Sequence, residues 1–227
     1  MDVQVEARIF LESQRGLFQT NGFCSFRTFN FDNYQAEGRE GFGKLLVVND
    51  ETLLAQCEHE IKVNEFCEVI LVPLAGGIEV NVEKDSPEFV SSGEALAFFA
   101  SPDQTYVVTN PYPEETINYL QIRVSTGHSN HKKQLSGFDL SNKNILLPVF
   151  SGGKREVNIY VGKYGGREEG IYSVSNPGSG VFVFVIEGAF EVQNRLLERR
   201  DGLSLRNAEV VEFEALSQDA VILVVEV

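Results

Sequence analysis

The side chains best suited to metal chemistry in this sequence lie close together in its first third. Cys57, His59 and Cys67 fall within eleven residues, and thiolate and imidazole are ligands that transition metals prefer. Their spacing fits none of the usual paired-cysteine patterns. Together with Cys24 they make an odd number of cysteines, and the sequence opens without an export signal. We therefore expect three reduced structural thiols, with a thiolate metal site as the alternative.

Two further histidines, His128 and His131, stand beside Lys132 and Lys133 in a polar stretch. Histidines in such a composition are more often solvated than ligating, so we expect exposed side chains here. No histidine follows residue 131. The last part of the chain is therefore not expected to hold a histidine metal site.

The composition is that of a folded protein, and its charge excludes some partners. Hydrophobic residues make up 43% of the 227 residues, and the formal net charge is -14. A strongly negative surface repels phosphate backbones and anionic lipids, so we expect no nucleic-acid or membrane partner. The N-terminus has no basic or apolar signal segment, and the longest apolar runs are far shorter than a membrane span. We expect a cytoplasmic protein.

The elements that must position these side chains are strands. From Ile61 to Val124, short β-branched and aromatic runs are separated by Gly, Pro, Asn, Asp and Ser, at intervals of about 8 to 12 residues, which is typical of an antiparallel sandwich or barrel. The stretch from Ser125 to Asn144 is polar and poor in strand-forming residues, so it is predicted to be a linker. A second set of strands follows it.

The second half weakly repeats the first, which predicts one architecture used twice. Gly77–Val80 resembles Gly188 and the residues after it, and both halves end in a similar strand, at Leu120–Val124 and Ile222–Val227. The predicted organisation is an N-terminal domain at 1–124, a linker at 125–144 and a C-terminal domain at 145–227.

An ordered set of segments carries a resemblance to a known family. They are Ser25–Tyr34, Gly41–Asp50, Cys67–Ile70, Asn118–Ile122 and the region from Phe182 onward. In this order and spacing the chain resembles the pirin family, particularly its bacterial quercetinase-like members. The resemblance implies an all-β protein of two tandem cupin barrels, each a double-stranded β-helix or jelly roll.

The resemblance also implies where a metal would lie. Family members hold one metal in the N-terminal barrel through a His-Pro-His segment, six and four residues before a glutamate, plus a later His and usually a Glu. Counting from Glu68 places the first pair on Lys62 and Asn64, and the second pair falls on Tyr106 and Val108. These residues offer an ammonium, an amide, a phenol and a hydrocarbon, which are poor ligands for transition metals. We therefore expect no metal cofactor.

In this interpretation the former metal site is a pocket lined by Lys62, Asn64, Tyr106 and Val108, with Glu68 and Gln121 as neighbours. The lysine favours a small polar or anionic ligand. Burial could lower the pKa of Lys62 enough to make a reactive amine, or the amine could pair with a nearby carboxylate such as Glu68 and replace the charge of the missing ion. The leading hypothesis is thus a pirin-like bicupin without oxygenase activity.

Two alternative functions stay open. Glu58, His59 and Glu60 could form a displaced metal site, which would make the protein a metal-dependent, quercetinase-like dioxygenase. In a regular strand, however, only the two glutamates share the side-chain parity of Lys62. Because eukaryotic pirins are linked with transcriptional regulators, the chain could instead be a protein-interaction module. Its acidic charge would then suit a basic protein partner.

Overall fold

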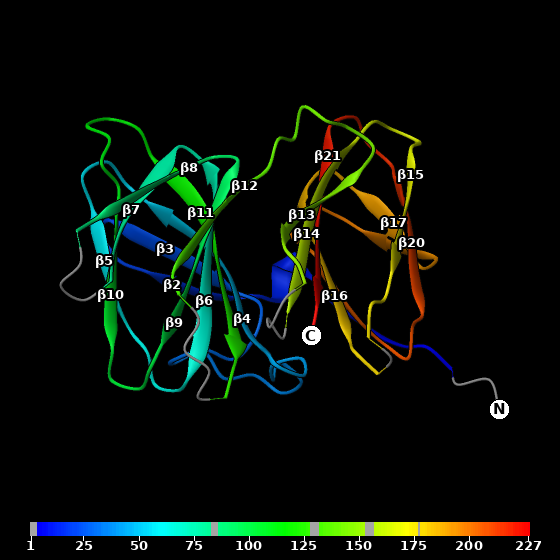
Figure 1. The fold of residues 1–227 in the computed structure, drawn as a ribbon, viewed down its shortest axis with the longest axis horizontal. Helices are drawn as coiled ribbons and strands as arrows, with labels where there is room; N and C mark the ends of the chain where they lie inside the picture. Colours follow the sequence, from blue (N-terminus) through cyan, green and yellow to red (C-terminus); the bar gives the residue numbers. More distant parts are fainter. Residues whose placement is uncertain (1–3, 83–85, 128–131, 153–156, 177) are drawn as a thin grey trace. The chain divides into compact units, whose positions relative to one another are not determined.

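The structure is a computed structural model that describes residues 4–82, 86–127, 132–152, 157–176 and 178–227 (Figure 1). Within these residues the chain is built from strands and one short 3-10 helix, η1 (Glu12–Gln14), which confirms the all-β prediction. No helix there is long and apolar enough to cross a membrane. His128 and His131 lie outside the described residues.

Residues Gly16–Gly137 form one compact unit, the N-terminal barrel, from two antiparallel sheets. The larger sheet has the strand order β12 (Gln134–Gly137), β9 (Glu94–Ala100), β6 (Cys67–Ala75), β11 (Ile117–Ser125), β4 (Leu45–Leu53), β3 (Phe23–Arg27) and β2 (Gly16–Gln19). The smaller sheet has the order β5 (Glu58–Lys62), β10 (Thr105–Thr109), β7 (Gly77–Val82) and β8 (Glu88–Ser91).

The second unit, the C-terminal barrel, contains Phe138–Val227 together with the described residues up to Arg15. Its larger sheet has the order β1 (Glu6–Phe10), β19 (Gly202–Arg206), β16 (Val181–Glu187), β21 (Ala220–Glu226), β14 (Asn158–Tyr164) and β13 (Leu146–Phe150). Its smaller sheet has the order β15 (Glu169–Ser173), β20 (Val210–Ala215), β17 (Phe190–Val192) and β18 (Arg195–Leu197).

The unit boundaries differ from the predicted 1–124, 125–144 and 145–227. Strand β1 belongs to the C-terminal barrel because it pairs along β19 from Glu6 opposite Arg206 to Phe10 opposite Gly202. Part of the predicted linker is strand β12, which extends the N-terminal barrel by pairing with β9. Both segments are edge strands whose side chains are mostly exposed, so neither shows an alternation of apolar and polar residues that would predict a strand.

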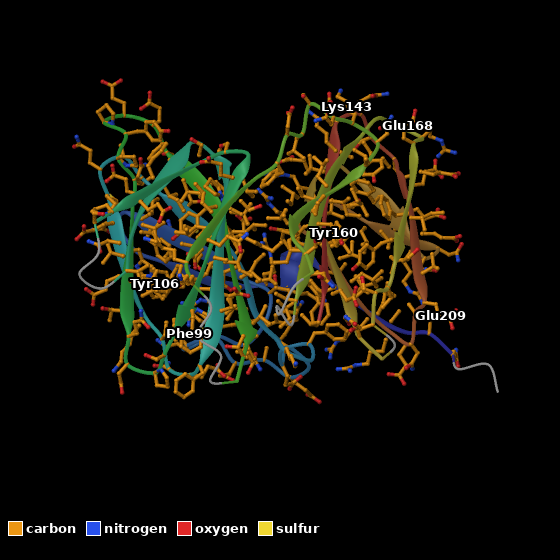
Figure 2. All side chains as sticks on the ribbon, viewed as in Figure 1. Phe99, Tyr106, Lys143, Tyr160, Glu168 and Glu209 are labelled. Atoms are coloured by element: carbon orange, nitrogen blue, oxygen red, sulfur yellow. The ribbon has the colours of Figure 1, made fainter. Side chains whose placement is uncertain are left out.

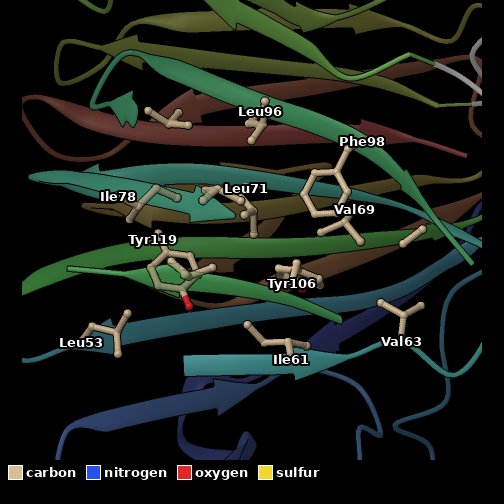
Figure 3. Close-up of a cluster of buried hydrophobic side chains, with 14 of the residues drawn as sticks. Leu53, Ile61, Val63, Val69, Leu71, Ile78, Leu96, Phe98, Tyr106 and Tyr119 are labelled. Atoms are coloured by element: carbon tan, nitrogen blue, oxygen red, sulfur yellow. The ribbon is translucent and has the colours of Figure 1, made fainter. Parts of the chain in front are cut away.

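Each barrel encloses its own core, and the N-terminal one is shown in Figure 3. In the N-terminal barrel, inward-facing residues from both sheets meet, among them Ile61, Val69, Leu71 and Tyr106. Strands β6 and β11 are buried along almost their whole length, so both faces of the larger sheet are covered. Strand β10 instead alternates between buried and partly exposed residues, which places Tyr106 and Val108 on one inward face.

Candidate functional site: a polar cluster inside the N-terminal barrel

Lys62 and Asn64 do not line the barrel. Both side chains are exposed, and Lys62 Nζ pairs with Asp103 Oδ1 at 2.7 Å, with the two side chains 59% and 84% exposed. The neighbouring residues Ile61 and Val63 are buried in the core instead. Because side chains alternate along an extended segment, the inward positions are the odd-numbered ones, and the predicted pair was one residue out of register.

Tyr106 and Val108 do face the interior. On strand β10, Tyr106 lies opposite Ile61 and Val108 lies opposite His59, and both side chains are fully buried. Figures 2 and 3 show Tyr106 inside the N-terminal barrel. The side chains opposite Val108 and Tyr106 are therefore the imidazole of His59 and the hydrocarbon of Ile61.

The two predicted pocket neighbours lie on different faces of the larger sheet. Gln121 is fully buried and points inward, since it pairs with core residue Leu71. Glu68 is also buried, but it lies between the core residues Cys67 and Val69 and so faces away from the barrel interior. Lys62 does pair with a carboxylate, but the partner is the exposed Asp103 and not the suggested Glu68.

Of the three residues of the alternative metal site, Glu58, His59 and Glu60, only His59 turns inward. Glu58 and Glu60 are exposed, whereas the imidazole of His59 stacks on Phe23 with ring centroids 3.7 Å apart and planes 14° apart. Burial lowers the pKa of His59, and Arg27 lowers it further against the opposing effect of Asp32. A largely neutral ring stacked on phenylalanine is a packing element as much as a base.

The inward-facing residues around Tyr106 and Val108 do not fit a metal ion. Among the described residues, no three His, Cys, Asp or Glu side chains gather closely enough to hold one. Of the inward positions nearest Tyr106, only His59 offers an imidazole, and Ile61, Val63 and Val108 are hydrocarbons. The thiol of Cys67 is buried, and burial raises its pKa to about 11, so it stays protonated near neutrality.

The interior near Tyr106 contains a group of side chains that we call the inner polar cluster. Its members are buried polar side chains on the inward faces of β3, β4, β10 and β11: Ser25, Arg27, Asn49, Glu51, Tyr106, Tyr119, Gln121 and Arg123. Cross-strand register aligns six of these residues in two rows. One row runs Arg27, Asn49, Gln121, and the other runs Ser25, Glu51, Tyr119.

Hydrogen bonds connect the cluster across both sheets. Arg123 Nη2 donates to the hydroxyl of Tyr106 at 3.3 Å, and that hydroxyl donates to Gln121 Oε1. On the neighbouring strand, Glu51 Oε1 accepts from Asn49 Nδ2 at 3.4 Å and from Ser25 Oγ at 3.4 Å. The network thus joins β10 of the smaller sheet to the larger sheet.

Burial controls the charge states of the cluster. It raises the pKa of Glu51, against the opposing effects of Tyr119, Asn49, Arg123 and Ser25, and so favours the neutral carboxylic acid. Burial likewise raises the pKa of Tyr106 far above its usual range. Burial alone would lower the pKa of Arg123, but Tyr106 and other neighbours outweigh this effect and raise it. The interior therefore holds a permanent cation beside an acid that resists ionisation.

Phe31 joins the two guanidinium groups of the cluster. The carbon of each group, in Arg27 and in Arg123, lies 5.0 Å from the centre of the Phe31 ring, which is a cation–π geometry. Arg27 Nη1 donates to the carbonyl of Phe31 at 2.9 Å, and Arg27 Nη2 pairs with Asp32 at 3.3 Å. Phe31 is partly exposed, and it pairs with Tyr34 in a tight loop.

This loop packs closely on strand β2. An added Cβ on Gly16 would lie 2.3 Å from the ring of Tyr34, a distance that no side chain could tolerate. Glycine at position 16 therefore lets the loop that carries Phe31 approach the barrel.

Several atoms of the cluster have no hydrogen-bond partner among the described residues. They are Gln121 Nε2, Arg123 Nε, Arg27 Nε, Asn49 Oδ1, Glu51 Oε2 and the Tyr119 hydroxyl, and their side chains are all at least 95% buried. A buried polar atom without a partner costs about 1–3 kcal/mol. So many together in one interior indicate a place suited to binding a small polar molecule.

The C-terminal barrel has a cavity of a different kind, with a volume of about 670 Å³. It is lined by Tyr164, Phe213 and Ile171 and by several carboxylates, namely Glu169, Glu191, Glu212 and Glu214. Glu214 lies opposite both Glu169 and Glu191 and pairs with Arg167 at 2.9 Å. These carboxylates are exposed or only partly buried, so they do not form a buried network like that of the N-terminal barrel.

Comparison with known proteins confirms the class that the fold and the sequence suggest. Residues 154–227 match the quercetinase C-terminal cupin domain. No curated protein matches the sequence significantly. The C-terminal part of the chain thus matches a quercetinase-type cupin domain, and the chain as a whole has the fold of a bacterial pirin.

The whole chain superposes on known bicupin structures. Bacterial pirin YhhW from Escherichia coli, solved in complex with nickel(II), has a TM-score of 0.84 at 20% identity, covering 98% of this chain and 99% of that one. Quercetin 2,3-dioxygenase from Acinetobacter baumannii has a TM-score of 0.71 at 13% identity, covering 96% of this chain and 85% of that one. At these identities the likeness concerns the fold.

Proposed function

We propose that this protein is a pirin-like bicupin whose N-terminal barrel binds a small polar or anionic ligand without a metal and does not act as an oxygenase. The observation that carries the proposal is the inner polar cluster, in which buried donors and acceptors lack partners among the described residues. Tyr106, one of the four positions where the family resemblance implies metal ligands, belongs to this cluster.

Local charge favours an anion over a neutral or cationic ligand. Arg27 and Arg123 bring two guanidinium groups to the cluster, and the exposed carboxylate of Asp32 pairs with only one of them. The nearby Glu51 has a raised pKa, so it neutralises Arg123 only in part. The chain as a whole has a net charge of -14, so the positive charge buried in this barrel is a local feature that the overall charge does not explain.

Calorimetric titration with a panel of small carboxylates tests the proposal. We expect at least one member to bind the wild type, and Arg123→Met to weaken that binding at least about tenfold, because the guanidinium supplies charged donors. Lys62→Met is the matched control, since it removes an exposed cation outside the barrel, and it should leave the affinity unchanged. Equal effects of the two variants, or no binding by any carboxylate, would contradict the proposal.

Elemental analysis of the purified protein tests the metal-free part separately. A near-stoichiometric transition metal, lost on substitution of His59, would favour the displaced-site oxygenase instead. The inward orientation of His59 is the one structural feature in favour of that alternative. We expect the metal content to be far below one ion per chain.

A further inference from the structure

The hydroxyl of Tyr106 fixes the orientation of the amide of Gln121. A phenol has one proton to donate, and arginine can only donate. Since Arg123 Nη2 donates to the Tyr106 oxygen, the Tyr106 proton is free to go to Gln121 Oε1. The other end of the amide, Gln121 Nε2, is therefore an N–H donor, and it has no partner among the described residues.

An unused acceptor lies directly opposite this unused donor. Gln121 on β11 pairs with Asn49 on β4, so their side chains leave the sheet on the same face about 5 Å apart. Asn49 Nδ2 points to Glu51 Oε1, which leaves Asn49 Oδ1 as an acceptor without a partner in the described part of the chain; Glu51 Oε2, in the adjoining row, is another. One donor and one acceptor thus stand side by side.

A charged donor stands next to this pair. Arg123 follows Gln121 by two residues on the same inward face of β11, a separation of about 7 Å along a strand. The ring of Phe31 lies over the carbon of the guanidinium group. A guanidinium group donates in its own plane, so Arg123 Nε stays available at the edge of the group, and it has no partner among the described residues.

From this arrangement we infer that the ligand is a small 2-hydroxycarboxylate, which carries an anionic acceptor and a hydroxyl donor on neighbouring carbons. The inference rests on the proposed function and names its ligand class. The carboxylate accepts from Arg123 Nε and Gln121 Nε2, and the hydroxyl donates to Asn49 Oδ1. A simple carboxylate would satisfy the donors and leave Asn49 Oδ1 without a partner, which disfavours it.

Ordered water is the competing occupant, because a buried water molecule takes two to four polar partners of this kind. Water and the hydroxycarboxylate differ in one respect that can be measured. A site built for water has no preference between carboxylates with and without a hydroxyl group, whereas the inferred site requires both groups on one molecule.

Calorimetric titration of the full chain with DL-lactate, propanoate and 2-methoxypropanoate tests the inference. Lactate should bind at least about tenfold more tightly than propanoate, which lacks the hydroxyl. The methyl ether keeps the oxygen but cannot donate, so it should bind no better than propanoate. In Asn49→Leu, lactate should lose its advantage, and propanoate should bind within about threefold of its wild-type affinity. Lys62→Met should preserve the preference.

The outcomes separate the inference from the proposed function. Equal binding of lactate and propanoate would overturn the hydroxycarboxylate and leave an anion site. Binding of lactate with no effect of Asn49→Leu would overturn the assignment of Asn49. If none of the three compounds binds, the inference fails, and the wider panel of carboxylates decides whether the proposed function fails with it. The comparison of lactate with 2-methoxypropanoate uses only the wild-type protein, so the inference can still be tested if Asn49→Leu does not fold.

Discussion

Ile61 on strand β5 lies directly opposite Tyr106 on strand β10, and both side chains are buried inside the N-terminal barrel. This pairing fixes the parity of the whole strand. Every second residue of β5 turns inward from His59, so Lys62 must point to solvent. The cation of the candidate site is therefore a guanidinium from another strand and not the lysine amine.

Substitutions at Ile61 and Lys62 should differ sharply in stability. Lys62→Ala removes an exposed ion pair with Asp103, which contributes little to stability because solvent screens both charges. Ile61→Ala removes a buried side chain, 5% exposed, and should cost about 2–5 kcal/mol. Urea unfolding followed by circular dichroism measures both. A larger loss at Lys62 than at Ile61 would mean that the strand has the opposite parity.

Tyr106→Phe should destabilise the protein without opening a cavity. The variant keeps the ring but removes the hydroxyl that accepts from Arg123 and donates to Gln121. Both partners stay buried, so the expected cost is about 1–3 kcal/mol of unfolding free energy. Tyr160→Phe, at a partly buried position of the other barrel, is the control and should cost less. Equal effects would show that the hydroxyl is not part of a network.

Glu51→Gln should gain stability relative to the wild type as the pH rises. The folded state raises the pKa of Glu51 above its ordinary value of 4.5, so the folded protein holds this proton more tightly than the unfolded chain. Stability is then greatest below pH 4.5 and falls as the pH rises through the folded pKa. The amide introduced by the substitution cannot ionise. Urea unfolding from pH 4 to pH 8 should show the difference between the variants growing with pH, and a constant difference would contradict it.

His59 should resist protonation in the folded protein. Its pKa is lowered by burial from an ordinary value of 6.5, so the unfolded chain binds this proton more readily. The contribution of His59 to stability is therefore present above pH 6.5 and is lost as the pH falls below it. Nuclear magnetic resonance titration of the imidazole measures the pKa directly. His59→Phe should preserve the contact with Phe23 and flatten the dependence of stability on pH in this range.

Cys67 should be the last of the three cysteines to react with a thiol reagent. It is fully buried, and burial raises its pKa to about 11, whereas Cys24 and Cys57 are only partly buried. Alkylation followed by mass spectrometry of native protein should leave Cys67 unmodified until the barrel unfolds. Early modification of Cys67 under native conditions would show that the barrel opens locally.

Strand-forming composition and turn residues were sufficient to predict the fold class, because β-branched and aromatic runs between turns have few other stable arrangements. The position of β1 could not be predicted in this way. Its partner β19 begins at Gly202, and pairing over such a separation leaves no local pattern. The family resemblance was confirmed by comparison of the sequence and the fold.

The candidate site was harder to predict because the sequence does not say which face of a strand is inward. Glu58–Lys62 ends just before a non-strand segment that leads into β6, and counting residues back from Glu68 carries no parity across such a segment. Asn49 and Glu51, like Gln121 and Arg123, stand two residues apart in their strands. Polar residues two apart in a strand are equally typical of a face that meets solvent. The sequence alone does not show that both faces of the central strands are buried, as they are here.

The pairing of β1 with β19 also affects how the protein is made. Ribosomes deliver the chain from its N-terminus, so the nascent protein can complete the barrel of Gly16–Gly137 while its first strand still lacks a place to dock. That strand must wait until Gly202–Arg206 has been translated. Residues Glu6–Phe10 are thus synthesised before both barrels and dock among the last, and in the meantime they are exposed to chaperones, proteases and neighbouring chains.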